Sequence, residues 1–453
     1  MVRDEILQRF VDQAPIAVMV RATIARTVGH SALDAIFERH ADAQYTRELT
    51  FSTLARLMSQ VVFRTYPTIN AAHRHAKDIP VSVTSVYNKL NGLETGVSQA
   101  LVAETARSMD EVVAALPAAP ADRPVAGLRL RTLDGNFLAG TDHRLACLRG
   151  CGAAALPGMA LVVRDGRTGL LTDLIPCEDA YTNERALHPR VLALVEPDDL
   201  WLGDRNFCTD DYLSGIAGRA AYFLIRHHAG TALHPLGPES RRRRHRDGTI
   251  SEQPVRVGPL ECRCLIIRLK EPLRDGTTEI RLLTNVPPGR LSARRASELY
   301  RTRWRIESAF QELTESLRCE IDTLGYPKAA LFGFALAVVS YNVLVTTRAA
   351  LASGLGEEVG GVEALSSYHM ATQVAAVDEG LSIAVPQSAW ARFVAMTAAE
   401  FAGWLDGVAR AIDWRPYRKQ PRGPKKPVAV KRTRRGAHRS TARELSKSQG
   451  SAP

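Results

Sequence analysis

The sequence predicts a mixed α/β protein built from several parts, and three observations lead to that prediction. The chain has 453 residues, more than one domain usually holds. Apolar residues recur at helical spacing through the first 122 residues, whereas strand-like and helix-like segments alternate after them. The last 40 residues are rich in Pro, Gly, Ser, Lys and Arg and poor in apolar residues, which is typical of disorder.

The first 122 residues are expected to be helical. Helices are predicted at 5–13, 31–41, 51–62 and 98–116. Segments 69–76 and 82–90 resemble a helix-turn-helix whose second helix carries polar residues suited to phosphates and base edges: Ser82, Thr84, Ser85, Asn88 and Lys89. A plain helical bundle fits the pattern equally well. A Pro-Ala-rich linker at 117–124 marks the boundary.

The centre of the chain alternates strands and helices. A strand at 128–133 ends at Asp134, and a hairpin joins 160–163 to 170–175. A helix, a strand ending at Asp204, a helix and another strand follow, up to residue 226. Residues 229–286 are β-rich and are interpreted as an insertion, after which long helices are expected at 293–317 and 329–351.

These patterns divide the chain into five parts. Residues 1–122 form a helical N-terminal domain, and residues 123–228 with 287–352 form an α/β domain in two segments. Between these two segments lies a β-rich insertion at 229–286. A helical C-terminal region at 353–413 and a disordered basic tail at 414–453 complete the chain.

Bulk composition excludes several classes of protein. No apolar run is long enough to span a membrane, and the N-terminus carries no secretion signal, so a cytoplasmic protein without a membrane partner is expected. Seven cysteines without a Cys-x-x-Cys pair favour neither structural zinc nor a disulfide framework. Residues 414–453 hold 13 basic residues and one acidic residue, a net charge of 13 − 1 = +12, which exceeds the net charge of +11 of the whole chain. Nucleic-acid binding by the other residues would therefore have to come from local basic patches.

Three acidic residues are candidates for a metal site. Asp134 and Asp204 are each predicted to end a strand, where α/β sheets place their ligands. Glu307 lies in a strongly amphipathic helix that can pack against the same sheet edge. Three carboxylates held together suit two Mg²⁺ ions, the arrangement used for displacement at phosphorus.

The neighbours of Glu307 strengthen this interpretation. Tyr300, Arg303 and Glu307 are spaced three and four residues apart and share one helical face. An Arg and a Tyr beside a metal-binding Glu would suit a bound phosphate. The alternative is an exposed helix with an ordinary Arg–Glu ion pair.

These motifs resemble the DDE transposases of bacterial insertion sequences, and most closely the group with a Tyr-Arg-Glu-Lys signature (the insertion sequence four type). The resemblance covers about residues 30–352. It is carried by Tyr300-x-x-Arg303-x-x-x-Glu307, by Leu282-Leu-Thr-Asn285, by Leu133-Asp-Gly135 with Arg144-Leu145, and by Leu202-Gly-Asp-Arg-Asn-Phe-Cys208.

The resemblance implies a ribonuclease-H-like core interrupted by a β-rich insertion, with a helical DNA-binding N-terminus. It implies that Asp134, Asp204 and Glu307 are catalytic and bind two Mg²⁺ ions, for which Mn²⁺ can substitute. Tyr300 and Arg303 would contact phosphate near the cut end. The implied partners are the terminal inverted repeats of the element and target DNA, bound by a homodimer associated with the nucleoid.

The sequence departs from the family pattern at one position. The signature Lys should follow Glu307 by seven residues, and Thr314 stands there. Arg318, one turn further on, is the candidate replacement. Two other functions therefore stay open: a nuclease of the same fold without strand transfer, and an inactive descendant that binds DNA. Asp142 competes with Asp134 for the first acidic position.

Further residues are candidates for DNA contact. Arg241, Arg242, Arg243 and Arg244 form a run of like charge that an anion would neutralise. Trp304 is expected to pack in the core, with stacking on a flipped base as the alternative. Arg205 and Asn206 could equally contact DNA or brace the turn after Asp204, and the basic tail could tether DNA or only aid solubility.

Overall fold

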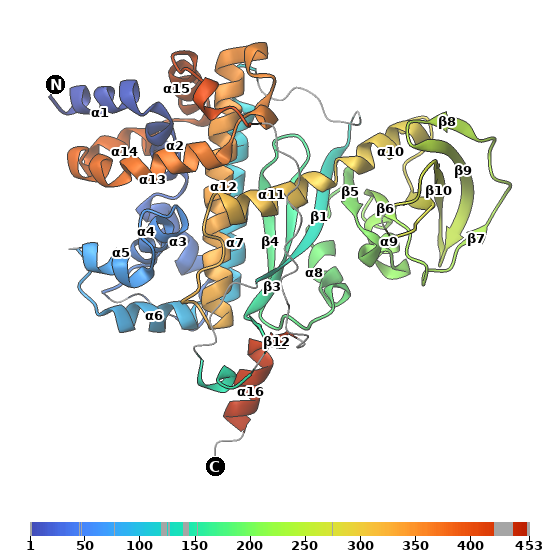
Figure 1. Ribbon diagram of the computed structural model, residues 1–453, viewed down its shortest axis with the longest axis horizontal. Coiled ribbons are helices and arrows are strands. Elements are labelled where there is room, and N and C mark those ends of the chain that lie inside the picture. The colour runs from blue at the N-terminus through green and yellow to red at the C-terminus, as the bar shows by residue number, and fades with distance from the viewer. Residues whose placement is uncertain are drawn as a thin grey trace.

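The computed structural model describes residues 2–44, 46, 48–76, 78–118, 125, 127–138, 145–151, 153–273, 275–420 and 438–450. Figure 1 shows a block of helices beside a twisted sheet that extends away from it. The α-helices are α1 (Val2–Gln13), α2 (Pro15–Thr27), α3 (His30–His40), α4 (Phe51–Val62), α5 (Ile69–His75), α6 (Val83–Gly92), α7 (Thr95–Ala114), α8 (His188–Leu192), α9 (Asp210–Ala217), α10 (Ala293–Arg301), α11 (Trp304–Glu315), α12 (Pro327–Leu355), α13 (Ser367–Ala384), α14 (Gln387–Ala395), α15 (Ala398–Arg410) and α16 (Thr441–Gly450).

The sheet contains ten strands within the described residues, and its inner half has a ribonuclease-H-like order. That half runs β4 (Leu171–Cys177), β3 (Gly158–Asp165), β1 (Arg129–Leu138), β5 (Asp199–Gly203) and β6 (Tyr222–Arg226). The first three strands are antiparallel, and β1, β5 and β6 are parallel. Because helices pack on both faces of this order, the predicted fold class is confirmed.

The predicted β-rich insertion continues the central sheet instead of forming a separate unit. Its strands are β7 (His234–Pro235), β8 (Arg243–His245), β9 (Gly248–Val257), β10 (Leu260–Leu269) and β11 (Glu279–Thr284). β11 pairs antiparallel with β6, and β10, β9 and β7 follow in order (Figure 1). The backbone groups of β6 that would otherwise form a free edge are therefore paired.

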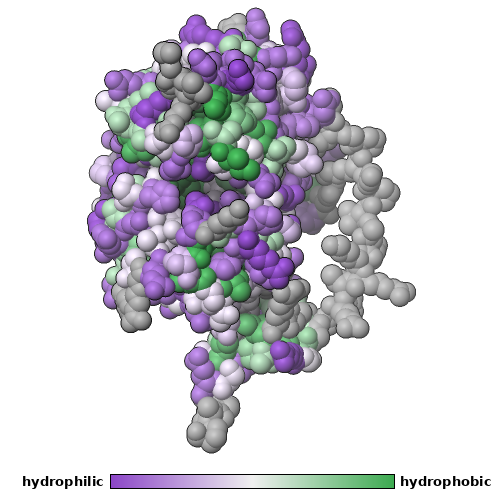
Figure 2. All heavy atoms as spheres, turned by 90° about the vertical axis from the view of Figure 1, so that its left-hand side faces the viewer, coloured by the Kyte–Doolittle hydropathy of each residue, from purple (hydrophilic) through white to green (hydrophobic). Residues whose placement is uncertain are grey.

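Both ends of the chain contribute to one helical body. Residues of α2, α4, α7, α12, α13 and α15 share a single hydrophobic core. The N-terminal helical domain and the helical region at 353–413 were expected to be separate parts of the protein. Both segments are helical as predicted, but they pack together around one core. Figure 2 shows a face of this body on which hydrophilic residues predominate around small apolar patches.

Helix α12 is the central helix of this body. By length and composition it could cross a membrane, contrary to the expectation that no apolar run is long enough, but its apolar window is entirely buried inside the protein. Its Asn342 side chain both donates to the carbonyl oxygen and accepts from the amide of Leu171 at the start of β4, each at 2.8 Å. This pair of hydrogen bonds fixes α12 against the sheet.

The two helices predicted at 69–76 and 82–90 are present as α5 and α6, and both contribute residues to the core of the helical body. Ser82 caps α6 by accepting from the amide of Ser85, and Thr84 and Asn88 are exposed. Lys89 points the other way, because its ammonium donates to the carbonyl of Leu49 at 2.8 Å. Four of the five expected polar residues are therefore exposed, whereas the Lys89 side chain is bound within the protein.

The tail differs from the expectation of disorder over residues 438–450. Arg439 and Ser440 form a short parallel pairing with β2 (Ala155–Leu156), and α16 follows. The Ser440 hydroxyl donates to Asp179 at 2.6 Å, and Arg443 forms an ion pair with the same carboxylate at 2.8 Å. Residues 421–437, which hold much of the basic charge, lie outside the described residues, as does most of the linker at 117–124.

Replacing Asn342 should destabilise the protein without affecting its surface. In Asn342→Leu the buried amide and carbonyl of Leu171 lose their partners, which should cost about 3 kcal/mol of unfolding free energy. Urea unfolding followed by circular dichroism measures this change. The exposed Asn88→Leu should stay within about 0.5 kcal/mol, and equal stability of the two variants would contradict the assigned role of Asn342.

Candidate active site

The register of β1 and β5 places Asp134 beside Asp204. The last parallel pair is Thr132 with Leu202, and two residues further along each strand are the two aspartates. The sequence predicted that Asp134 ends its strand. In the structure Asp134 instead lies within β1, where it pairs with Val162 of β3. The strand continues because β3 still pairs with it after β5 has ended at Gly203.

The two aspartates are held by backbone amides. One oxygen of Asp134 accepts from the amide of Gly135 at 3.0 Å. Asp204 caps the 3₁₀ helix η3 (Arg205–Phe207) and accepts from the amide of Asn206 at 2.8 Å. Asn206 therefore braces the turn after Asp204, which was one of its two expected roles, while Arg205 is exposed.

Arg303 joins Asp134 to Glu307. Its Nη1 atom lies 3.0 Å from Asp134 Oδ2, and its Nη2 atom lies 2.7 Å from Glu307 Oε1. Glu307 is in the first turn of α11, and Arg303 lies at the break between α10 and α11. The predicted helix at 293–317 is thus two helices, but the break leaves Arg303 and Glu307 on the same side. The structure brings together Asp134, Arg303 and Glu307, with Asp204 adjacent.

Tyr300 also faces the aspartates. Its hydroxyl donates to the carbonyl of Gly203, next to Asp204, at 3.3 Å. Burial raises the pKa of Tyr300 to about 12, so the hydroxyl is protonated and remains a donor at neutral pH.

Burial of the Asp134 carboxyl group has the largest effect on the electrostatics of the cluster. The pKa of Asp134 is raised to about 6, mainly because the carboxyl group is buried. The Arg303 guanidinium and the Gly135 amide lower this pKa, whereas the carboxylates of Asp204 and Glu307 raise it. Three like charges therefore interact around one guanidinium.

The carboxylates of Asp134, Asp204 and Glu307 are suitable ligands for a hard cation, but they are not arranged around a common point. Among the residues that the structure describes, no group of three His, Cys, Asp or Glu side chains is arranged to hold a metal ion. Arg303 lies between Asp134 and Glu307 and neutralises them, and its Nε atom is buried without a hydrogen-bond partner among the described residues. Carboxylate oxygens are the ligands that Mg²⁺ takes in proteins, and the repulsion seen at Asp134 is what such a cation would relieve.

Several predicted DNA-binding residues lie away from this cluster. Arg318 donates from its guanidinium to the carbonyl of Pro67 in the helical body, so it does not replace the missing Lys in this arrangement. Thr314 is exposed, and its hydroxyl donates to the carbonyl of Phe310 at 3.1 Å. Asp142 lies outside the described residues, as does Arg144.

The arginine run lies in the outer part of the sheet. Arg241, Arg242, Arg243 and Arg244 are exposed, on β8 and the residues just before it. Nearby, the imidazole of His245 is buried, with Nε2 3.0 Å from the Ser297 hydroxyl of α10. The run is therefore carried on a segment that is anchored to the helix leading into the site.

Trp304 is not in the core, contrary to expectation. Its side chain is 62% exposed, and the Arg303 guanidinium lies 5.4 Å from the ring centroid. The helix break at residues 302 and 303 turns this side chain outward, next to the carboxylates.

Glu184 was not singled out in the sequence, although it belongs to the site. It accepts from the Asn206 side chain at 3.2 Å, and its pKa is raised, mainly by burial and also by the Asp204 carboxylate. No local motif marks Glu184, because it lies 20 residues before Asp204. This separation is much larger than the spacing of residues that share a face of one helix or strand.

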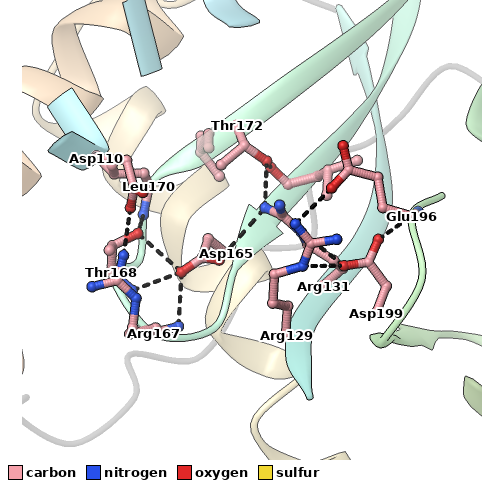
Figure 3. A network of polar contacts seen from close by, with 12 residues as sticks. Asp110, Arg129, Arg131, Asp165, Arg167, Thr168, Leu170, Thr172, Glu196 and Asp199 are labelled. Atoms are coloured by element: carbon pink, nitrogen blue, oxygen red, sulfur yellow. Dashed lines mark hydrogen bonds and ion pairs between the residues drawn. The ribbon is translucent and has the colours of Figure 1, made fainter. Parts of the chain in front are cut away.

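A second charged cluster lies at the opposite end of β1. Arg129 is 2.6 Å from Glu196 and 3.0 Å from Asp199, and Figure 3 shows the other members around Arg131 and Asp165. Opposite charges are paired there, so the cluster is a structural link between β1, β5 and the neighbouring loops. It borders a cavity of about 490 Å³, and another of about 330 Å³ lies among the helices. Neither is lined by Asp134, Asp204 or Glu307.

The raised pKa of Asp134 predicts a pH-dependent stability. The folded protein binds this proton more tightly than the unfolded chain, whose carboxyl has a pKa of 3.8. The wild type should therefore lose stability relative to Asp134→Asn as pH rises from 4 to 7, by up to ~3 kcal/mol. Urea unfolding in EDTA at each pH measures the difference, with the exposed Asp211→Asn as control. A difference that does not change with pH would contradict the burial of this charge.

Comparison with known proteins agrees with this geometry. Residues 147–343 match the family model described as "Transposase DDE domain", a segment that includes Asp204 and Glu307 but begins after Asp134. No curated protein sequence matches the chain. Among solved structures, the chain is similar to a piggyBac transposase in a synaptic complex with hairpin DNA, with a TM-score of 0.39 and 10% identity over 83% of this chain and 84% of that one. A similarity at this level carries no argument about residues. Part of the chain is thus similar to a transposase DDE domain, and that part contains two of the three acidic residues of the cluster.

Proposed function

We propose that the chain is a DNA transposase that cleaves the ends of an insertion sequence and joins the resulting 3′-hydroxyl to target DNA. The observation that carries the proposal is the convergence of Asp134, Glu307 and the adjacent Asp204 at one edge of the parallel strands. The finer assignment to the group with the Tyr-Arg-Glu-Lys signature is also a proposal, and it rests on Tyr300, Arg303 and Glu307.

The three carboxylates would hold two Mg²⁺ ions, or Mn²⁺ in their place. Bound there, the metal would supply charge stabilisation at the phosphate oxygens and activation of the attacking oxygen. The carboxylates of Asp134 and Glu307 bind Arg303 in this structure. A metal held by the same oxygens would neutralise them, and Arg303 could then donate to a phosphate, which is the role that the resemblance implies for it.

Tyr300 would orient the same phosphate. Its hydroxyl keeps its proton at neutral pH and lies beside Asp204. In the present arrangement it donates to the carbonyl of Gly203. A phosphate oxygen is a stronger acceptor than a carbonyl, so Tyr300 can exchange one partner for the other.

Other surfaces would hold the DNA. The exposed ring of Trp304 lies next to Arg303 and offers a stacking platform for a base. Arg241, Arg242, Arg243 and Arg244 would contact the backbone, and α6 would dock through its exposed polar residues. Two DNA ends must be held together for joining, so the working complex is proposed to be a homodimer on the nucleoid, with terminal inverted repeats and target DNA as partners.

Thr314 favours two competing functions. Its hydroxyl is bound within its own helix, and Arg318 is bound to the helical body, so neither supplies the signature Lys contact in this arrangement. A nuclease without strand transfer, or an inactive DNA-binding descendant, would tolerate that loss.

Substituting the acidic residues should abolish catalysis and spare DNA binding. Asp134→Asn, Asp204→Asn and Glu307→Gln should each lower cleavage of an end-containing duplex by roughly 1000-fold, because each removes a charged oxygen from the reaction centre. Cleavage is measured in Mg²⁺ with and without EDTA, and DNA binding by gel shift. Asp211→Asn and Glu315→Gln are matched exposed controls.

The same assay separates the three functions. Joining of a pre-cut end to plasmid DNA by the wild type supports the transposase, and cleavage without joining supports the nuclease. DNA binding without any cleavage, unaffected by Asp134→Asn, supports the inactive descendant and contradicts the proposal.

Trp304→Ala should weaken DNA binding while leaving stability unchanged, since the ring is exposed. Loss of one stacked base should reduce affinity for a frayed or single-stranded end by about 1–3 kcal/mol, and Trp304→Phe should retain most of it. Fluorescence anisotropy with a labelled end duplex measures the change. Equal affinity of Trp304→Ala and the wild type would remove this residue from the DNA surface.

A further inference from the structure

The turn that carries Asp204 has no sheet partner of its own. The parallel ladder between β1 and β5 ends at Thr132 and Leu202, and β5 itself ends at Gly203. Strand pairing brings Asp204 beside β1, but Asp204 itself begins a short 3₁₀ turn that lies beyond the paired residues. Contacts made by this turn can therefore add to the strand pairing in holding Asp204 near Asp134.

Glu184 supplies a contact on the Asp204 side. It begins the 3₁₀ helix η2 (Glu184–Leu187), which follows β4 and is capped by Asn183. Its Oε2 atom accepts from the Asn206 side chain at 3.2 Å, while the amide of Asn206 donates to Asp204 at 2.8 Å. One residue, Asn206, thus links Glu184 to Asp204.

A second contact strengthens this link. The Nε atom of Arg185 donates to the backbone carbonyl of Asn206 at 3.2 Å. Two consecutive residues of η2 therefore hold Asn206: Glu184 binds the side chain of Asn206, and Arg185 binds its backbone carbonyl. The turn is fixed as a unit, so the orientation of Asp204 is fixed with it.

The other oxygen of Glu184 reaches the strand that carries Asp134. A Cβ atom added at Gly135 would collide with Glu184 Oε1, so the carboxylate lies directly against the glycine backbone. Gly135 is also the residue whose amide holds Asp134. The absence of a side chain at Gly135 leaves room for this carboxylate, and a methyl group there would displace it.

We propose that Glu184 is a positioning residue that ties the turn carrying Asp204 to the strand carrying Asp134. The proposal rests on the proposed function, because it concerns the pair of aspartates assigned to the metal. The link requires an acceptor oxygen at the reach of a glutamate side chain. Glutamine supplies such an oxygen, whereas alanine does not.

The test compares Glu184→Gln, Glu184→Ala and Gly135→Ala, with Glu315→Ala as an exposed control. The readouts are the Mn²⁺ dissociation constant of the DNA-free protein, by calorimetry, and kcat and KM for cleavage of an end duplex. Loss of a residue that orients a ligand typically costs about 10- to 100-fold in metal affinity or activity. Glu184→Ala should show such a loss in Mn²⁺ affinity and kcat with an unchanged KM for DNA, and Glu184→Gln should stay within about 3-fold of the wild type.

Gly135→Ala should resemble Glu184→Ala, because the new methyl group displaces the carboxylate. If Gly135→Ala does not fold, as judged by circular dichroism, the Gln and Ala variants at position 184 test the proposal alone. Equal losses of Mn²⁺ affinity and kcat in Glu184→Gln and Glu184→Ala would show that the charge of Glu184 acts directly. Wild-type behaviour of Glu184→Ala would show that the link is dispensable. Either result overturns the proposal. Failure of the proposed function is seen separately, as unchanged Mn²⁺ affinity and cleavage in Asp204→Asn.

Discussion

The parallel pairing of β1 with β5 is the constraint on which the site depends. It brings Asp134 and Asp204 side by side at a sheet edge, and two neighbouring carboxylates repel unless a cation lies between or beside them. In this structure the Arg303 guanidinium pairs with Asp134 and also binds Glu307. The path of the chain makes this contact possible: β11 pairs with β6, and α10 and α11 follow it with Arg303 at the break between them.

The location of the acidic cluster fits a long substrate better than a small one. Both described cavities lie elsewhere, one among the helices and one at the opposite end of β1. Glu307 is 37% exposed at its side chain, whereas Arg303 is only 10% exposed. The Glu307 carboxylate is thus accessible from the surface while the Arg303 guanidinium is sheltered, so a large substrate can reach this carboxylate without entering a cavity.

Local patterns predicted many of the strands and helices, and with them the fold class, but missed others such as α2 and α16. They failed where the outcome depends on distant partners. The end of β1 was misplaced because Gly135 resembles a turn residue, whereas its role is to admit Glu184. The pairing of β11 with β6 joins residues 56 to 60 positions apart in the chain and leaves no local signal. The proximity of Asp134 and Asp204 could be anticipated because adjacent parallel strands share an edge, but the engagement of Arg318 with Pro67 could not.

The shared core of the helical body has a consequence for how the chain folds as it is made. Helices α2 and α4 bury their apolar faces against α12 and α13, which are synthesised some 300 residues later. The early helices therefore leave the ribosome with those faces uncovered, and at typical synthesis rates of about 5–20 residues per second they wait for tens of seconds. Nascent chains of this protein are accordingly expected to depend on chaperones, and a fragment ending before α12 lacks the surface that completes its core.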